Sequence, residues 1–221
     1  MRRIFLIFAI IGCFSGFSKA QKMSFGIVAN PQVSWIRPDI TKVERAGAKM
    51  GLNFGLNADF FFAKNYAFHT GLLINNTGGK LEFKDTINFY TTDSTFRIDP
   101  GSTIKYKLQY IDIPLGLKFK TKQLGYFTYY GQLGITAQVK VAARGSNDDY
   151  DINDAGISDE IGLFSVGYHI GGGMEYSLGG TTAILVGFKY TNGFVDITKD
   201  KNKVSDKSVL NAIAIQIGIL F

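Results

Sequence analysis

The strongest constraint on the fold is a period of two in the last residues of the chain. In the segment 209–221, VLNAIAIQIGILF, every odd position from Ile213 onward is bulky and apolar, whereas Ala214, Gln216 and Gly218 are small or polar. Successive side chains of a β-strand point to opposite faces, so the pattern predicts a strand with one apolar face. The same alternation predicts seven further strands, at about 25–35, 52–62, 68–74, 111–119, 127–141, 164–178 and 184–190.

The connections between the predicted strands alternate between long and short. Tight turns are predicted at 64–65, 122–124 and 179–180, and long polar loops at about 37–46, 85–101, 145–158 and 198–207. An even number of strands with short turns at one end is typical of bacterial outer-membrane barrels, whose longer loops face outside. We therefore expect an all-β, eight-stranded antiparallel up-and-down transmembrane β-barrel with both chain ends in the periplasm.

The apolar face of such strands could point outward to lipid, or inward as in a soluble lipocalin-like barrel. The opposite face combines many glycines with residues such as Asn53, His69 and Gln132, and we expect it to form the crowded interior of a narrow barrel. Aromatic residues flank the aliphatic band, as expected at membrane interfaces rather than in an ordinary core. Those near the short turns are Phe60, Phe62, Tyr66, Phe119, Phe127, Tyr129, Tyr176 and Phe221, and those near the long loops are Trp35, Phe164 and Tyr190.

The beginning of the chain has the features of an export signal. A basic start, an apolar stretch over 4–14 and small residues after it predict a signal peptide over 1–20, cleaved between Ala20 and Gln21. The apolar stretch is shorter than the roughly 20 residues that span a bilayer. The outer-membrane β-barrel domain is then predicted to cover 21–221.

Composition excludes several classes of function. Cys13 is the only cysteine, and a lipoprotein anchor there is disfavoured because the apolar stretch before it is too short; the mature chain then has no disulfide and no thiolate site. Removing three basic residues of the signal peptide from 24 leaves 21 against 18 acidic residues. Since the sequence holds no basic cluster, we expect no nucleic-acid partner.

The interior of an eight-stranded barrel is nearly filled by side chains, in contrast to the water-filled channel of barrels with about 16 strands. Buried charges are costly, by several kcal/mol per ion, unless they are paired and hydrogen-bonded. We therefore expect the inward charges to form a satisfied polar network, with a narrow polar path as the alternative. These residues are Asp59, Asp112, Lys118, Lys140, Glu175 and Lys189.

The chain offers little catalytic chemistry. His69 and His169 are its only histidines, and both are predicted to point inward from separate strands. A lipid-modifying enzyme would need its base on the lipid-facing wall or at the rim, and two histidines supply too few ligands for a metal site. We expect no catalytic residues and no cofactor.

One acidic loop matches part of a calcium-binding pattern. The residues Asp149, Asp151, Asn153 and Glu160 fall at positions 1, 3, 5 and 12 of such a loop. Asp154 replaces the turn glycine, however, and no helix flanks the loop. A solvated loop is therefore favoured over a calcium site, and a calcium titration that follows loop ordering distinguishes the two.

The segment 110–118, YIDIPLGLK, resembles a signature of the PorT-like outer-membrane β-barrel family, through Tyr110, Asp112, Pro114 and Lys118. The resemblance implies the barrel fold, an outer-membrane location and, from the namesake, a role in protein secretion through a type IX system. Proline removes a ladder donor and usually marks a bulge or an edge, so we expect a bulge at Pro114. Outer-membrane barrels resemble one another in a terminal phenylalanine, and this resemblance makes Phe221 an assembly signal for the barrel-assembly machinery.

The function expected from these features is that of a non-enzymatic integral outer-membrane barrel. It would be structural, or an accessory in envelope assembly, protein secretion or surface interaction. Its partners would be outer-membrane lipid, the barrel-assembly machinery and envelope or secretion proteins that contact the long loops. The alternatives are a narrow channel for small solutes and a small lipid-modifying enzyme.

The assignment of faces predicts an asymmetry within the last strand. Ile215→Arg places a charge near the middle of the bilayer and is expected to cost roughly 2 to 4 kcal/mol. Gln216→Arg changes the interior instead, where packing sets the cost. Equilibrium unfolding in lipid, followed by heat-modifiable gel mobility, measures both, and equal tolerance of the two arginines would contradict the assignment.

Overall fold

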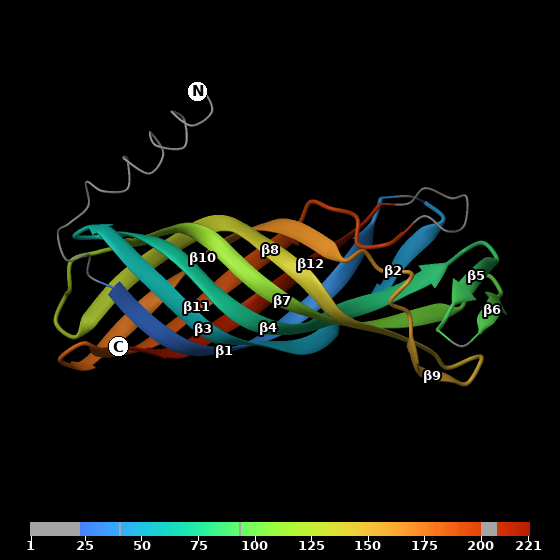
Figure 1. The fold of residues 1–221 in the computed structure, drawn as a ribbon, viewed down its shortest axis with the longest axis horizontal. Coiled ribbons are helices and arrows are strands. Elements are labelled where there is room, and N and C mark those ends of the chain that lie inside the picture. Colours follow the sequence, from blue (N-terminus) through green and yellow to red (C-terminus); the bar gives the residue numbers. More distant parts are fainter. Residues whose placement is uncertain (1–22, 40, 93, 200–206) are drawn as a thin grey trace, which may run out of the picture.

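Eight long antiparallel strands form a closed barrel in the computed structural model, which describes residues 23–39, 41–92, 94–199 and 207–221 (Figure 1). The predicted signal peptide and its cleavage site at Ala20 and Gln21 lie outside the described residues. None of the described residues belongs to a helix long and apolar enough to cross a membrane, a finding that does not bear on crossing by strands. The barrel strands are β1 (Met23–Pro38), β3 (Lys49–Ala63), β4 (Tyr66–Phe83), β7 (Thr103–Lys120), β8 (Phe127–Asn147), β10 (Phe164–Gly179), β11 (Thr182–Gly193) and β12 (Ser208–Leu220).

Pairing between β12 and β1 closes the barrel. The strand predicted from the final residues pairs with β11 on one side and with β1 on the other, where Ile213 lies opposite Val33. Phe25 and Phe221 exchange two backbone hydrogen bonds of 2.8 Å at the end of this seam. The described chain therefore begins and ends at the same end of the barrel, which is also the end with the short turns (Figure 1).

The outer wall of the barrel is apolar and its interior is polar, as predicted. On the outward face Leu56, Leu72 and Ile215 are 61%, 59% and 56% exposed, whereas the inward Asn30 and Asp59 are 0% and 2% exposed. This inverts the arrangement of a water-soluble barrel, in which apolar side chains fill the centre. The wall is thus suited to contact with hydrocarbon.

Aromatic side chains gather at both ends of this apolar wall. Near the short turns, Tyr66 meets Phe119 edge to face at 5.7 Å between ring centroids, and Phe127 lies 5.2 Å from Tyr176. At the other end Tyr168 contacts Tyr190 at 6.2 Å and Phe194 at 5.4 Å. The predicted aromatic belts are therefore present in the described strands.

Inward-facing glycines let the walls of this narrow barrel accommodate large side chains. Gly173 of β10 lies opposite Gly187 of β11, and the hydroxyl of Tyr130 fills the space that their missing side chains leave. A Cβ atom on Gly187 would lie 2.3 Å from this hydroxyl and 2.6 Å from the carbonyl oxygen of Gly172. The glycine pair is thus a condition for the position of Tyr130.

The long loops contain more structure than the sequence indicated. They hold four additional short strands: β2 (Val43–Gly47), which pairs with β4; the hairpin of β5 (Ile87–Tyr90) and β6 (Thr95–Ile98); and β9 (Ile152–Gly156), which pairs with β8. We call these four strands and the connections around them the crown. In Figure 1 the crown extends the barrel at the end opposite the start of β1 and the C-terminus. The predicted long connections are present, but the sequence did not indicate the strands within three of the four.

An apolar core fills the barrel beneath the crown. Its members come from barrel strands and crown segments alike, and each is at most 5% exposed. They are Ile36, Val43, Leu81, Phe89, Ile98, Ile104, Tyr106, Leu108, Tyr110, Ala143, Ile152, Ile157, Ile161, Ile197 and Leu210. At this end the barrel is therefore built like a water-soluble protein, with its apolar side chains inside.

The bulge predicted at Pro114 is absent. The pairs Thr70–Leu115 and Leu73–Asp112 keep one register across the proline, so no residue is inserted there. The proline, which has no N–H group, only interrupts the pairing of β7 with β4 at Ile113 and Pro114. A register shift occurs instead in the pairing of β7 with β8. It lies between Gln109 and Tyr110, where β8 holds an extra residue, Val141.

The packing of Tyr130 generates a test of the interior. Gly187→Ala places a methyl group against the Tyr130 hydroxyl and is expected to destabilise the barrel by about 1 to 3 kcal/mol. Gly131→Ala is the matched control, because a Cβ on Gly131 would meet no atom within 4 Å. Urea unfolding in detergent micelles, followed through the fluorescence of Trp35, measures both variants. Equal midpoints would contradict the packing described here.

Candidate functional site

The residues of the predicted family signature form the inward row of β7. Tyr110, Asp112 and Lys118 are 0%, 4% and 1% exposed, and Pro114 is buried between them. Each charged or aromatic member belongs to a different layer of the barrel interior. Tyr110 belongs to the apolar core, Asp112 to a middle layer of amides, and Lys118 to a layer of ions near the short turns. The signature therefore organises the interior from one end to the other.

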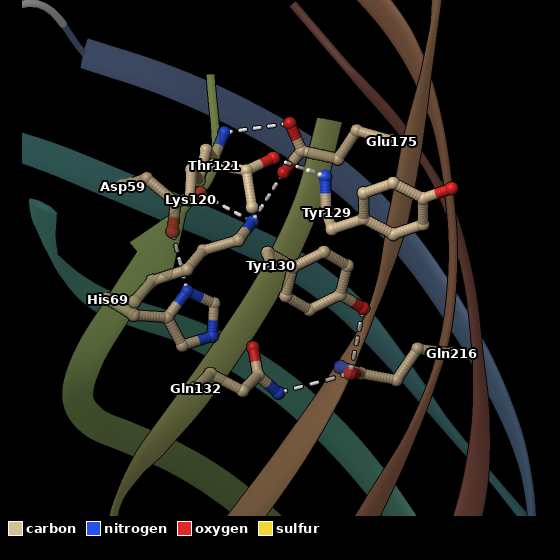
Figure 2. A network of polar contacts seen from close by, with 10 residues as sticks. Asp59, His69, Lys120, Thr121, Tyr129, Tyr130, Gln132, Glu175 and Gln216 are labelled. Carbon is tan, nitrogen blue, oxygen red and sulfur yellow. Dashed lines mark hydrogen bonds and ion pairs between the residues drawn. The ribbon is translucent and has the colours of Figure 1, made fainter. Parts of the chain in front are cut away.

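The ion layer joins two carboxylates to two ammonium groups (Figure 2). The Lys118 ammonium lies 2.8 Å from Asp59 Oδ2 and 2.9 Å from Glu175 Oε1, and Lys120 lies 2.8 Å from Glu175 Oε2. His69 completes the layer, with its Nδ1 atom 2.6 Å from Asp59 Oδ1. Because the charges balance and each contacts an opposite charge, this part of the predicted network is satisfied.

Aromatic and amide groups cover the ion layer on the side of the barrel centre. The Lys118 ammonium lies 4.7 Å from the centroid of the Tyr130 ring, a cation–π contact. The Tyr130 hydroxyl and Gln132 Nε2 both donate to Gln216 Oε1, at 3.2 and 3.1 Å (Figure 2). Strands β7, β8 and β12 are thereby tied together across the lumen.

The middle layer surrounds a single carboxylate with amide donors. Asn53 and Asn75 donate to Asp112 Oδ2 at 2.9 and 2.8 Å, and Gln138 donates to Oδ1 at 2.8 Å. Asn30 and Gln32 in turn donate to the first two amides. Amides from four other barrel strands, β1, β3, β4 and β8, thus contribute to the solvation of Asp112, which has no ion-pair partner among the described residues.

Two lysines depart from the predicted network. Lys189 is buried and interacts electrostatically with Asp112, but no ion pair or hydrogen bond joins it to another described residue. Lys140 donates to the backbone oxygens of Ser158 and Ile161, at 2.5 and 2.7 Å. Lys140 therefore fastens a crown segment to β8 instead of balancing an interior carboxylate, so Lys140 and Lys189 do not form the ion pairs expected of a satisfied network.

The interior is open at one end and blocked at the other. A cavity of about 980 Å³ occupies the short-turn end, with Lys64, Lys120, Lys122 and Glu175 in its lining. Beyond it the lumen is crossed by the ion layer, the amide layer and then the apolar core. The prediction of a side-chain-filled lumen holds for these layers but not for the short-turn mouth.

The four candidate calcium ligands lie in the part of the crown that contains β9. Asp149, Asp151 and Asn153 are exposed, and Glu160 follows at the end of the next turn. In the described part of the chain, no three acidic, histidine or cysteine side chains converge on one point. The calcium site stays a prediction from spacing.

Two other aspartates of the same segment form ion pairs with lysines. Asp148 and Asp154 each lie 2.5 Å from an ammonium group, of Lys105 and Lys107 respectively. The hydrogen bond from the lysine is the main cause that lowers the pKa of each carboxyl below its usual value. Because the pKa of each carboxyl is lower in the folded protein, each ion pair stabilises the fold at pH values above about 4, the ordinary aspartate pKa. This stabilisation is lost as the pH falls from there through the lowered pKa.

Sequence reasoning missed the apolar core of the crown, although the sequence carries a signal for it. Along β7 the apolar positions are even from Ile104 to Tyr110 and odd from Ile111 to Phe119. Even-numbered residues face inward along the whole of β7. The change from even to odd apolar positions therefore marks the level at which the apolar side chains pass from the interior to the outer face. A search for such changes of parity would have found the core.

A closed eight-stranded barrel with an apolar, aromatic-bordered wall defines the class of transmembrane β-barrels. The family described as "Outer membrane protein beta-barrel domain" matches residues 10–199, and this chain belongs to that family. It is accordingly an integral outer-membrane protein. No curated protein matches the sequence.

Two solved structures of outer-membrane proteins align with most of this chain. Neisserial surface protein A aligns with a TM-score of 0.50 at 13% identity, over 90% of this chain and 98% of that chain. The outer-membrane protein OprG of Pseudomonas aeruginosa aligns with a TM-score of 0.47 at 14% identity, over 91% and 95% of the two chains. At 13% identity the likeness to Neisserial surface protein A is one of fold alone.

The ion layer predicts a strong dependence on Asp59. Asp59→Asn removes the carboxylate that contacts both Lys118 and His69 and is expected to destabilise the barrel by about 3 to 5 kcal/mol. Asp85→Asn is the control, because its ion pair with Lys42 is exposed and is expected to contribute less than about 1 kcal/mol. Guanidinium unfolding in detergent compares the two. Similar losses in both variants would show that the ion layer does not stabilise the barrel.

Proposed function

We propose that this protein is a non-enzymatic outer-membrane barrel whose crown is a preformed interaction surface for other envelope or secretion proteins. The short-turn end, with both chain ends, then lies in the periplasm and the crown lies outside the cell. The observation that carries the proposal is the apolar core beneath the crown, which joins all four long connections to the barrel wall.

Hydrogen bonds between distant segments support a fixed crown surface. The backbone N–H of Thr92, after β5, donates to the carbonyl of Gly156 in β9 at 2.8 Å. The Asp99 N–H donates to the Tyr150 hydroxyl at 3.0 Å. Surfaces that are ordered before binding lose less conformational entropy when a partner arrives. Such a crown is therefore better suited to recognition than flexible loops would be.

The positions of the two histidines favour a non-enzymatic role over lipid modification. His69 and His169 are 5% and 2% exposed, and both point into the lumen. His69 binds Asp59 and His169 lies 2.9 Å from the Thr136 hydroxyl. A lipid held against the outer wall would contact neither ring.

The layered interior favours the same role over that of a narrow channel. A solute entering from the short-turn cavity meets the ion pairs of Lys118, then the amides around Asp112, and finally the buried apolar side chains near Tyr110. Passage would require several satisfied polar contacts and a packed core to open together.

A PorT-like role in secretion remains a finer proposal, supported by the signature on β7. Because Asp112 and Lys118 are buried, the signature itself supports the barrel framework, and any secretion partner would meet the crown. Phe221 at the β1–β12 seam is proposed as the signal that the barrel-assembly machinery recognises.

A matched pair of charge variants tests the proposal in cells. Thr95→Asp with Arg97→Glu alters exposed positions of the crown hairpin, and Lys122→Glu with Gln123→Glu makes the same change in charge at the exposed short-turn end. Both variants are expected to accumulate as heat-modifiable barrels in the outer membrane. Only the crown variant is expected to fail to complement the envelope or secretion defect of a deletion strain.

Two further measurements address the alternatives. We expect no discrete conductance steps in planar bilayers and an unchanged lipid A profile when the gene is deleted. Full complementation by the crown variant, a steady conductance, or an altered lipid A profile would each contradict the proposal.

A further inference from the structure

A row of cations crosses the outer wall just above its apolar band. Lys80 of β4 lies opposite Lys105 of β7, and Lys107 of β7 lies opposite Arg144 of β8. These four residues, here named the basic ledge, alternate with buried neighbours and therefore face outward. Like charges directly opposite each other destabilise a sheet unless other charges compensate.

The chain compensates only part of this charge. Asp148 pairs with Lys105 and Asp154 with Lys107, whereas neither Lys80 nor Arg144 has an ion-pair partner among the described residues. Two carboxylates therefore face four cations at this level of the wall.

The residues bordering the ledge leave its charge positive. Lys49 of β3 adds a further cation. Its side chain lies against Gly78 of β4, where a Cβ atom would be 3.2 Å from Lys49 Cδ, and its ammonium group donates to the Thr77 carbonyl. The next outward residue on β4 is Glu82, which lies opposite Glu44, and Glu44 is held by Lys84.

The ledge lies close to the aliphatic part of the outer wall. Down the outward face of β7, Lys107 is followed by Gln109 and then Ile111, so the change from cation to aliphatic residue takes four residues, about 13 Å along the strand. Gln109 donates to Asn76 of β4 at 3.0 Å, so a pair of amide side chains lies between the cations of the ledge and the aliphatic wall. Beside the ledge, the Arg45 guanidinium lies 5.0 Å from the centroid of Trp35.

We propose that the basic ledge binds the phosphorylated headgroups of outer-leaflet lipids. Asp148 and Asp154 interact electrostatically with Lys80 and Arg144 but form their ion pairs with Lys105 and Lys107. A phosphate beside Lys80 or Arg144 supplies the ion-pair partner that these two cations lack, and the acyl chains lie along the aliphatic wall below. Lysine and arginine form strong charge-assisted hydrogen bonds with phosphate oxygens, and clustered cations at a membrane surface attract anionic headgroups. The assignment to the outer leaflet rests on the proposed orientation of the crown.

Binding to purified protein tests the ledge independently of that orientation. The full barrel in detergent is titrated with bisphosphorylated lipid A or with the same lipid after phosphate removal, and retained lipid is counted by native mass spectrometry. The ledge variant is Lys80→Gln with Arg144→Gln. Its control is Lys42→Gln with Lys84→Gln, which removes the same charge from exposed crown positions.

Wild type and the control variant are expected to prefer the phosphorylated lipid by at least about tenfold, and the ledge variant to lose about tenfold in affinity for it. Excess inorganic phosphate is expected to leave retention largely unchanged, because the acyl chains contribute to binding. Equal retention by the ledge and control variants, equal retention of the dephosphorylated lipid, or full displacement by free phosphate would overturn the proposal. Heat-modifiable mobility of both variants verifies that they are folded, so a negative result cannot be attributed to unfolding.

Discussion

Backbone hydrogen bonding is the constraint on which this structure depends. Hydrocarbon offers no partner for an unpaired N–H or C=O group, so a sheet can cross a membrane only when it has no free edge. The β12–β1 seam, with its paired backbone bonds between Phe25 and Phe221, provides that closure. Closing only eight strands makes a narrow tube, and the inward glycines, such as Gly173 and Gly187, make room in it for Tyr130 and the ion layer.

The barrel changes its construction along its own axis. Near the short turns the wall is apolar outside and the interior holds balanced charges around Lys118; at the crown the interior becomes an apolar core. The change follows the surrounding solvent, because apolar side chains are favoured outward in lipid and inward in water. Val141 lies at this level, where the extra residue in β8 shifts its register against β7. The crown can thus be both ordered and exposed, and the cations of the basic ledge lie at the boundary.

Much of the architecture could be predicted from the sequence, but less of the interior chemistry could. The eight strands, their outward faces and the short turns follow from local alternation. The partners of the inward charges do not, since they depend on which strands face each other across the lumen: Lys118 meets Asp59 and Glu175, whereas Lys189 has no ion-pair partner in the described chain. Pro114 was misjudged for a related reason. Its effect depends on whether the neighbouring strand loses hydrogen bonds or gains a residue, and here it only loses bonds.

The sequence by itself determined the class of the protein, because the period of two and the composition of each face are properties of single strands. Only the tertiary structure decided how residues from different strands combine. The basic ledge is the clearest case, since Lys80, Lys105, Lys107 and Arg144 are scattered in the chain and form a row only in the register of three strands. The apolar core beneath the crown is a second case, since Phe89, Ile152 and Ile197 come from three separate connections whose sequences showed no common pattern. Register and loop packing are set by contacts between residues distant in sequence, and alternation within one strand carries no information about them.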